Sequence, residues 1–205
     1  MDRGCFIVFE GIDGAGKTTQ VRLLADALRN EGRKVYITAE PTSLESGKEL
    51  RRVLSGEIKK SDCEIAAMFT LDRIAHNIDS GDGIEKMVNE GYVVICDRYY
   101  YSTLAYQGST VDYGWVKALN VGCPEIRRPD LCIFLDLTPE ESMARLSRGR
   151  DGTEIYENVE TLTRVRDSFL RVLDDLGESD RIAVINASGS VEAVAEKILE
   201  AVKAL

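Results

Sequence analysis

Residues 11–18, Gly-Ile-Asp-Gly-Ala-Gly-Lys-Thr, match the pattern G-x-x-x-x-G-K-[ST]. The match directly follows an apolar run at residues 5–9 and directly precedes a helical pattern of apolar residues. This strand–loop–helix context is the one in which the pattern forms a phosphate-binding loop. The glycines let the backbone fold around an anion, and the start of the following helix adds a field that favours negative charge. The motif therefore predicts an α/β fold and the binding of a nucleoside triphosphate.

Two residues that close the motif have separate predicted tasks. Lys17 can reach the β- and γ-phosphates, and the Thr18 hydroxyl can ligate Mg²⁺. The residues that we predict to contact the triphosphate are Gly11, Ile12, Asp13, Gly14, Ala15, Gly16, Lys17, Thr18 and Thr19.

Strand-like and helix-like segments alternate along the rest of the chain. Strands are expected at residues 5–10, 35–38, 92–96, 131–137 and 182–185. Helices are expected at residues 17–31, shortly after Gly47, at 62–78 with Ser61 and Glu64 as a capping box, at 83–89, from 139, and at 159–176 and 191–205. Such alternation predicts one domain over residues 1–205, a P-loop NTPase fold whose five-stranded parallel sheet carries helices on both faces. The polar, glycine-containing segment at about residues 148–157 predicts a short mobile lid loop.

Charge and composition exclude several classes of partner. The net charge is −9 and no general basic patch is visible, which argues against nucleic-acid binding. No apolar run is long enough to cross a membrane, and no signal peptide is expected. The five cysteines show no metal-ligand or disulfide spacing, which suits a reducing, cytoplasmic location.

Arginines nevertheless gather locally, at residues 51–52, 127–128 and 145–150. In an acidic chain, such clusters fit the capture of small phosphorylated ligands. For the first two clusters, an exposed helix face explains the pattern equally well.

An acidic residue, Asp97, ends the third expected strand, and Arg98 follows it. An acid at this place is the usual partner of the loop threonine at Mg²⁺, although it could also be a helix cap or turn residue. Arg98 lies at the same edge of the sheet and could face a phosphate. A GTP-dependent switch would have glycine after the acid and an Asn-Lys-x-Asp motif, and neither is present.

Four stretches of the chain, at residues 9–20, 68–73, 97–108 and 128–140, resemble thymidylate kinases in order and spacing. The segment from Asp97 to Gln107 is the most specific of them. The resemblance implies transfer of the γ-phosphoryl group of ATP to dTMP, giving dTDP, with Mg²⁺ as cofactor. It also implies a homodimer. The apolar side chains of residues 62–78 could form its interface, although core packing explains them equally well.

The resemblance also implies roles at the acceptor site. Asp13 would bind the sugar 3′-hydroxyl, Phe69 would stack on thymine, and Arg73 would donate to a base carbonyl. Arg98 would hold the dTMP phosphate, and Tyr106 would crowd the 2′ position. The remaining predicted acceptor contacts are Glu40, Pro41, Arg51, Ser102, Thr103, Gln107 and Tyr156.

Without the resemblance, three of these residues have plainer explanations. Phe69 and Tyr106 could be core aromatics, and Arg73 could pair with Asp72 or Asp79 at the surface. The lone histidine, His76, is expected to have a structural or surface role.

The chain departs from some family members at two positions. Gly14 stands where some have a catalytic arginine in the loop, and Ala39 stands where some have an arginine before Glu-Pro. We therefore expect Arg150, with Arg145, to supply the catalytic charge from the lid.

In that arrangement Arg148 would stack on adenine, and Arg51 would replace the arginine missing at position 39. The residues predicted to be catalytic are thus Asp13, Lys17, Arg98 and Arg150. No general base is needed, because the attacking acceptor phosphate is already an anion.

Two other functions remain open at this point. The same fold could phosphorylate another nucleoside monophosphate or a nucleoside. Alternatively, the chain could be a nucleotide-binding switch that hydrolyses slowly, although it lacks the guanine motif.

Overall fold

Five parallel strands form the centre of the molecule in the order β2-β3-β1-β4-β5. The computed structural model describes residues 4–149 and 159–205. The strands are β1 (Cys5–Glu10), β2 (Val35–Ala39), β3 (Val93–Asp97), β4 (Leu131–Asp136) and β5 (Ile182–Asn186). All five lie within one residue of their expected bounds, so the α/β prediction is confirmed.

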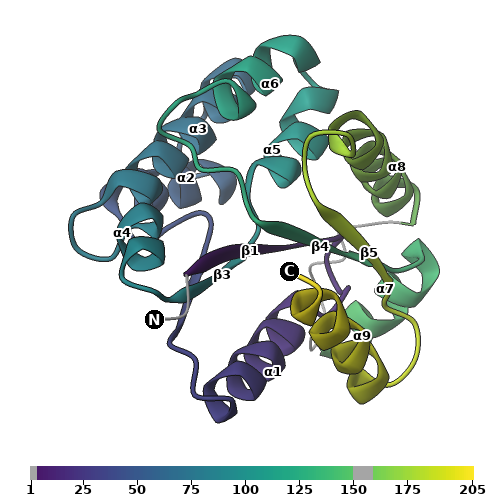
Figure 1. Ribbon diagram of the computed structural model, residues 1–205. Helices are drawn as coiled ribbons and strands as arrows, with labels where there is room; N and C mark the ends of the chain where they lie inside the picture. Colours follow the sequence, from purple (N-terminus) through teal and green to yellow (C-terminus); the bar gives the residue numbers. More distant parts are fainter. Residues whose placement is uncertain (1–3, 150–158) are drawn as a thin grey trace.

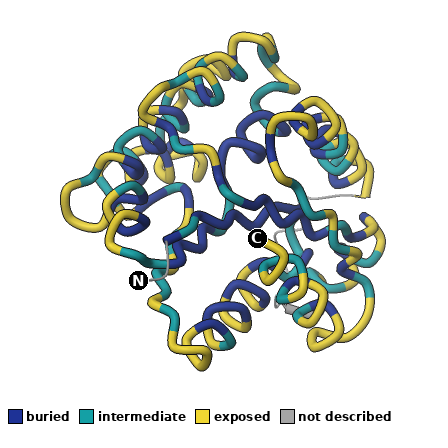
Figure 2. The backbone as a smooth tube through the Cα atoms, in the orientation of Figure 1, coloured by how far each residue is buried: buried dark blue, intermediate teal, exposed yellow. Residues whose placement is uncertain are grey.

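Helices cover both faces of this sheet. On one face α1 (Lys17–Asn30) packs beside α9 (Val191–Lys203), and the other face carries most of the remaining helices (Figure 1). The central strands β1, β3 and β4 are therefore almost entirely buried, as Figure 2 shows in dark blue. Burial on both faces explains why these strands are continuous apolar runs rather than alternating ones.

The sequence pattern also located most helices. The remaining ones are α2 (Glu45–Leu54), α3 (Asp62–Ile78), α4 (Ile84–Asn89), α5 (Tyr100–Tyr106), α6 (Tyr113–Val121), α7 (Pro139–Gly149) and α8 (Val159–Leu176), with a 3₁₀ turn at Gln107–Ser109. The expected capping box is present at the start of α3, where Ser61 and Glu64 bond each other's backbone N–H. Helix α2 begins before Gly47 rather than after it.

Helices α5 and α6 had no counterpart in the sequence prediction. Helix α5 consists of tyrosine, serine, threonine, leucine and alanine, and Tyr100 to Ala105 are all buried. A short helix without a polar face gives no amphipathic signal, and its aromatic and hydroxyl residues are weak helix formers. Packing against α8 therefore decides its conformation.

The expected lid needs one correction. Helix α7 continues to Gly149, so residues 148 and 149 lie within a helix instead of opening the loop. The rest of the expected lid, including Arg150 and Tyr156, lies outside the described residues. Within the described ranges, no helix has the length and apolar character needed to cross a membrane.

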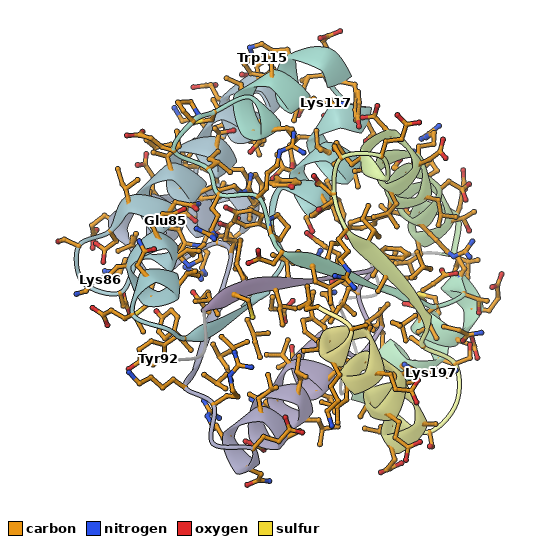
Figure 3. The ribbon with its side chains drawn as sticks, viewed as in Figure 1. Glu85, Lys86, Tyr92, Trp115, Lys117 and Lys197 are labelled. Atoms are coloured by element: carbon orange, nitrogen blue, oxygen red, sulfur yellow. The ribbon has the colours of Figure 1, made fainter. Side chains whose placement is uncertain are left out.

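Side-chain contacts join the outer helices. Trp115 and Lys117 lie at the outer end of α6 (Figure 3), and the Lys117 ammonium is 2.7 Å from the Asp175 carboxylate on α8. The Tyr113 hydroxyl donates to the same carboxylate at 2.7 Å. These contacts fix α6 against α8.

Candidate active site

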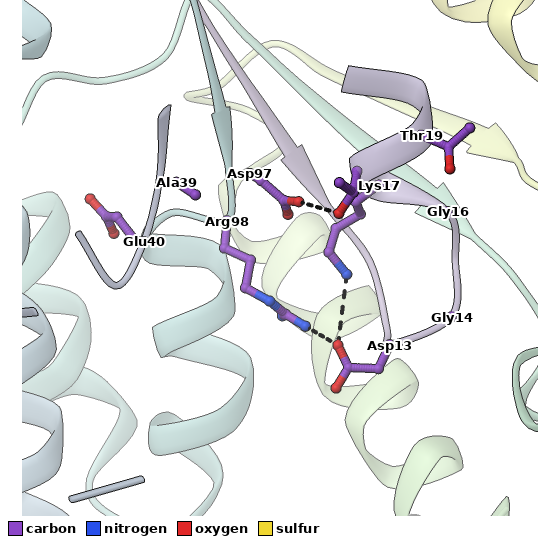
Figure 4. A pocket seen from close by; sticks show the side chains of 10 residues that line it. Asp13, Gly14, Gly16, Lys17, Thr19, Ala39, Glu40, Asp97 and Arg98 are labelled. Atoms are coloured by element: carbon purple, nitrogen blue, oxygen red, sulfur yellow. Dashed lines mark hydrogen bonds and ion pairs between the residues drawn. The ribbon is translucent and has the colours of Figure 1, made fainter. Parts of the chain in front are cut away.

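A cavity of about 410 Å³ opens at the carboxyl edge of the parallel sheet, where α/β proteins bind their ligands. Three segments that are distant in the chain meet there: the loop after β1, the end of β2 and the end of β3 (Figure 4). Its lining residues are Asp13, Gly14, Gly16, Lys17, Thr18, Thr19, Ala39, Glu40, Asp97 and Arg98.

The glycine-rich loop (residues 11–18) has the backbone that its sequence requires. Gly11, Gly14 and Gly16 have φ values of 142°, 77° and 95°, in a region that side chains disfavour. A Cβ atom at Gly14 would lie 3.0 Å from the Ser142 carbonyl oxygen, and one at Gly11 would lie 2.7 Å from that of Leu135. This backbone therefore requires glycine at position 14, the position at which some family members have an arginine.

Lys17 is buried at the centre of this loop. Its ammonium donates to the carbonyl oxygens of Gly11 at 2.9 Å and Ile12 at 3.2 Å, and it lies 3.9 Å from the Asp13 carboxylate. Burial, together with the nearby Arg98 charge, lowers the pKa of Lys17 to about 8. An anion in the cavity would therefore favour the charged form of this amine.

Thr18 and Asp97 lie next to each other at this edge of the sheet. The Thr18 hydroxyl donates to the Asp97 carboxylate at 3.1 Å, across the gap between α1 and the end of β3. A hydroxyl and a carboxylate are the hard oxygen donors that Mg²⁺ prefers. The described residues contain no cluster of three or more His, Cys, Asp or Glu side chains suited to a metal.

Arg98 is the only described non-glycine residue with positive φ, at 72°. A non-glycine residue in this region costs on the order of 1–3 kcal/mol, so its surroundings must hold it there. The backbone N–H of Arg98 donates to Phe9 O at 2.9 Å, and its own carbonyl accepts from the Cys96 thiol at 3.0 Å. The guanidinium forms an ion pair with Asp13 across the cavity (Figure 4).

The guanidinium of Arg98 stays positively charged. Its burial would lower the pKa, but the nearby Tyr106 hydroxyl and the carboxylates of Asp13, Glu10 and Asp97 raise it above the usual value for arginine. The ring of Tyr106 lies 5.7 Å below the guanidinium. A permanent cation therefore faces the cavity at the end of β3.

A buried ionic network lies behind the end of β2. The Arg73 guanidinium, 1% exposed, donates to the Glu40 carboxylate at 2.6 and 2.9 Å and to the Thr103 hydroxyl at 3.1 Å. It also donates to the side-chain carbonyl of Asn120. The alternative in which Arg73 pairs with Asp72 or Asp79 at the surface is therefore wrong.

His76 belongs to the same network and has a structural role. Its ring nitrogens lie 3.0 Å from the Glu40 carboxylate and 2.8 Å from the Thr38 hydroxyl. Glu40 therefore connects α3 to the end of β2, and one of its oxygen atoms faces Arg73 while the other faces His76.

The turn after β2 is held by Arg51 and Asp72. Arg51 donates to the carbonyl oxygens of Pro41 and Thr42, next to the cis Glu40–Pro41 peptide. Asp72, which is buried, accepts from the Thr42 backbone at 2.8 Å and from the Ser46 hydroxyl at 2.7 Å. In this structure Arg51 thus supports the turn that carries Glu40 and Pro41.

The aromatic side chains predicted for the acceptor site are only half-buried. This holds for both Phe69 and Tyr106, so neither is a plain core residue. Tyr106 packs edge-to-face on Phe169 of α8, at 5.9 Å between ring centres. Gln107 opens the 3₁₀ turn that follows α5.

Helix α7 contributes an arginine beside the glycine-rich loop. The Arg145 guanidinium donates to the carbonyl oxygens of Ala187 at 2.8 Å and Ala15 at 3.5 Å. It therefore lies against the outer side of the loop, between β5 and α1. The Arg148 side chain lies outside the described part of α7, and Arg150 and Tyr156 also lie outside the described residues.

Sequence reasoning missed one buried carboxylate next to the cavity. Glu10 is fully buried and accepts hydrogen bonds from the backbone N–H of Tyr99 at 2.8 Å and from the Ser102 hydroxyl at 2.6 Å. Burial raises its pKa to about 6. The available signal was an acidic residue at the end of an otherwise apolar strand, where an unpartnered charge would be costly.

The sheet order and the glycine-rich loop after β1 define a P-loop NTPase fold, and the cavity lies at the carboxyl edge of its sheet. Residues 9–198 match the family model described as "Thymidylate kinase". The chain therefore belongs to the thymidylate kinase family.

Individual relatives agree with the family model. The chain is 39% identical to "Probable thymidylate kinase" of Pyrococcus horikoshii, over 98% of this chain and 97% of that protein. It is 40% identical to the protein of that name in Methanococcus aeolicus, over 83% and 80% of the two chains. It is 32% identical to "Thymidylate kinase" of Sulfurihydrogenibium sp., over 98% and 97%.

Proposed function

We propose that this protein is a dTMP kinase, which transfers the γ-phosphoryl group of ATP to dTMP and gives dTDP for nucleotide biosynthesis. The observation that carries the proposal is the meeting of two cations, Lys17 and Arg98, on either side of Asp13 in one cavity. Family membership over residues 9–198 supports the same reaction.

The geometry separates a donor side from an acceptor side. The donor side is the glycine-rich loop, whose backbone N–H groups and Lys17 suit the ATP phosphates. The acceptor side is the opposite wall, where Arg98 suits the dTMP phosphate. Phosphoryl transfer depends mainly on such positioning and on cations near the developing charge. The acceptor phosphate is already anionic, so no residue has to act as a base.

Mg²⁺ belongs to the same proposal. Thr18 and Asp97 would hold it, and the ion would neutralise charge on the transferring phosphates. Their 3.1 Å contact at the wall of the cavity supports this assignment.

Asp13 and Arg73 are assigned to the sugar and the base of dTMP. Asp13 faces the cavity between Lys17 and Arg98, which suits an acceptor hydroxyl beside the acceptor phosphate. The contacts of Arg73 within the described residues use four of the five N–H groups that a guanidinium carries. One N–H group, on Nη1, is left for a base carbonyl in this assignment, and Glu40 and Asn120 hold the guanidinium in place.

The rest of the assignment follows the resemblance. Phe69 and Tyr106 would contact the base and sugar, Arg150 would supply charge from the lid, and Tyr156 would close over the acceptor. We also assign a cytoplasmic location, which the five free cysteines support. A single domain over residues 1–205 is supported by the one sheet with its continuous core.

A homodimer is part of the proposal as well. Leu71 and Ile78 lie on α3 with 60% and 53% of their surface exposed, which suits a helix face that packs against a second copy. Leu71→Arg should therefore convert a dimer into a monomer in analytical ultracentrifugation. A wild-type protein that sediments as a monomer at micromolar concentration would contradict this assignment.

The decisive experiment is coupled ATP-to-ADP turnover with Mg²⁺ against dTMP, dUMP, dCMP, dAMP, dGMP, UMP and thymidine, with a control that lacks acceptor. We expect strong preference for dTMP and only trace turnover in the control. Preference for another acceptor would keep the fold and discard the thymine-specific roles of Phe69 and Arg73. No acceptor-stimulated turnover would favour a nucleotide-binding module instead.

A further inference from the structure

One buried side chain, Glu10, bonds to the backbone of the segment that follows Arg98. This carboxylate ends β1, directly before the glycine-rich loop, and it does not line the cavity. Its Oε1 accepts the backbone N–H groups of Tyr99 at 2.8 Å and Ser102 at 3.2 Å. A fully buried carboxylate is costly unless hydrogen-bond donors surround it, so these contacts are strong constraints on the loop.

The same carboxylate reaches the Arg98 guanidinium through one hydroxyl. Ser102 Oγ donates to Glu10 Oε2 at 2.6 Å and accepts from Arg98 Nη1 at 3.1 Å. A hydroxyl has a single proton, and the bond to Glu10 commits that proton. The lone pairs of Ser102 Oγ therefore face Arg98. Arg98 is also held by Phe9, Cys96 and Asp13. To these contacts Glu10 adds a constraint on the backbone that follows Arg98 and, through Ser102, on the direction of the guanidinium.

We infer that Glu10 is a positioning residue for the acceptor phosphate, acting through Ser102 to hold Arg98 in its left-handed conformation with its guanidinium aimed into the cavity. The inference deepens the proposed function and rests on it, because it requires Arg98 to bind the acceptor phosphate.

The burial of Glu10 supports a functional rather than a stabilising role. Its pKa is raised to about 6 by desolvation, while the Ser102 hydrogen bond, the charges of Arg98 and Lys17 and the Tyr99 N–H act in the opposite direction. For a carboxyl group whose pKa is higher in the folded protein, ionisation at neutral pH lowers stability. A glutamine of the same shape would avoid that cost but could not orient Ser102 in the same way.

The test compares Glu10→Gln with a matched control, a second carboxylate that bonds to the backbone of β1. Asp130→Asn is the control, because Asp130 accepts the backbone N–H of Phe6 at 2.8 Å, at the opposite end of β1. We expect Glu10→Gln to lower kcat/KM for dTMP by about 10- to 100-fold, the range for loss of a charge-assisted hydrogen bond. KM for ATP should stay within about twofold, and Asp130→Asn should change neither KM.

A purely structural role predicts a different result. Loss of folded protein would lower kcat for every substrate pair equally and leave KM for dTMP unchanged. That pattern in Glu10→Gln would overturn the inference. If Glu10→Gln fails to unfold cooperatively, Ser102→Ala provides the same test, with an expected loss of about 3- to 10-fold in kcat/KM for dTMP, and an unchanged value would equally overturn the inference.

A double-mutant cycle with Arg98→Ala separates this inference from the proposed function. If Glu10 acts through Arg98, Glu10→Gln will add little to the loss caused by Arg98→Ala, whereas full additivity would contradict the inference. Absence of dTMP turnover in the wild-type protein would refute the proposed function. An active wild-type protein, an impaired Arg98→Ala and an unaffected Glu10→Gln would refute only the role of Glu10.

Discussion

The two sides of the cavity are built in different ways. On the donor side, the glycine-rich loop offers main-chain groups, and Lys17 bonds to carbonyl oxygens only five and six residues away. On the acceptor side, carboxylates hold arginines across large separations, 33 residues between Glu40 and Arg73 and 85 between Asp13 and Arg98. The first arrangement is local and the second is tertiary.

The two sides should be sensitive to different kinds of substitution. A loop built from backbone is sensitive to any added Cβ, because its glycines have positive φ and close neighbours. A network of buried charges is sensitive to the loss of one partner, because the other is then left uncompensated. Substitutions can therefore damage one side while the other is preserved.

The largest effect is expected for Glu40→Ala. This change leaves the buried Arg73 and His76 without their shared carboxylate, so the free energy of unfolding should fall by about 3–5 kcal/mol. In a chain of this size that corresponds to roughly 10 °C in Tm, measured by differential scanning calorimetry. KM for dTMP should rise while KM for ATP stays unchanged.

The control for Glu40→Ala is Glu57→Ala, which removes the exposed ion pair with Arg52 at 2.7 Å and should leave Tm unchanged. Equal shifts in Tm for the two variants would show that the Glu40 network is not the stabilising element of the acceptor side.

Gly14→Ala should damage the donor side instead. At Gly14 φ is 77°, and the added Cβ would lie 3.0 Å from the Ser142 carbonyl oxygen. We therefore expect the free energy of unfolding to fall by about 2–3 kcal/mol and KM for ATP to rise. Gly32→Ala is the matched control, since it has a φ of 81° and no neighbour within 4 Å. Gly32→Ala should lower the free energy of unfolding by about 1 kcal/mol and leave KM for ATP and for dTMP unchanged. A normal KM for ATP in Gly14→Ala would contradict the crowding argument.

The smallest effect concerns pH. The empty protein holds the Lys17 amine with a pKa of about 8, and ATP favours its charged form. Below about pH 8 the amine is already protonated, whereas above it binding must take up a proton. The Kd for ATP should therefore rise by up to tenfold per pH unit above about pH 8, with proton uptake visible by calorimetry in different buffers.

The acceptor side should not share this dependence, because Arg98 stays charged throughout the range. Lys17→Arg should also abolish the pH dependence of ATP binding. A Kd for ATP that is flat between pH 7 and 9.5 in the wild-type protein would be inconsistent with a neutral amine in the empty loop.

The donor side could be predicted almost completely from the sequence. Its residues are contiguous, their spacing matches a motif with a known backbone, and the flanking apolar pattern located β1 and α1 within one residue. The Thr18–Asp97 contact was also predictable, because the carboxyl ends of neighbouring parallel strands meet at one edge. The roles of these residues in catalysis remain predictions.

The residues of the acceptor side were predicted from the family resemblance, and the pattern of residue types along the chain did not indicate them. Thr103 on α5 and Asn120 on α6 accept hydrogen bonds from Arg73. The sequence of these two helices did not lead to their prediction. The burial of Arg73 and the part played by Glu10 depend on residues that are distant in the chain. A pattern read along the chain cannot show which buried carboxylate faces which arginine.

The sequence by itself thus determined the α/β class, the strands and the phosphate-binding backbone, because these follow from local periodicity, glycine geometry and short-range hydrogen bonds. The tertiary structure alone decided the charge network of Glu10, Glu40, Arg73 and Arg98. The physical reason is that a buried charge is tolerable only beside its partners. Those partners are brought together by the packing of the whole sheet and its helices.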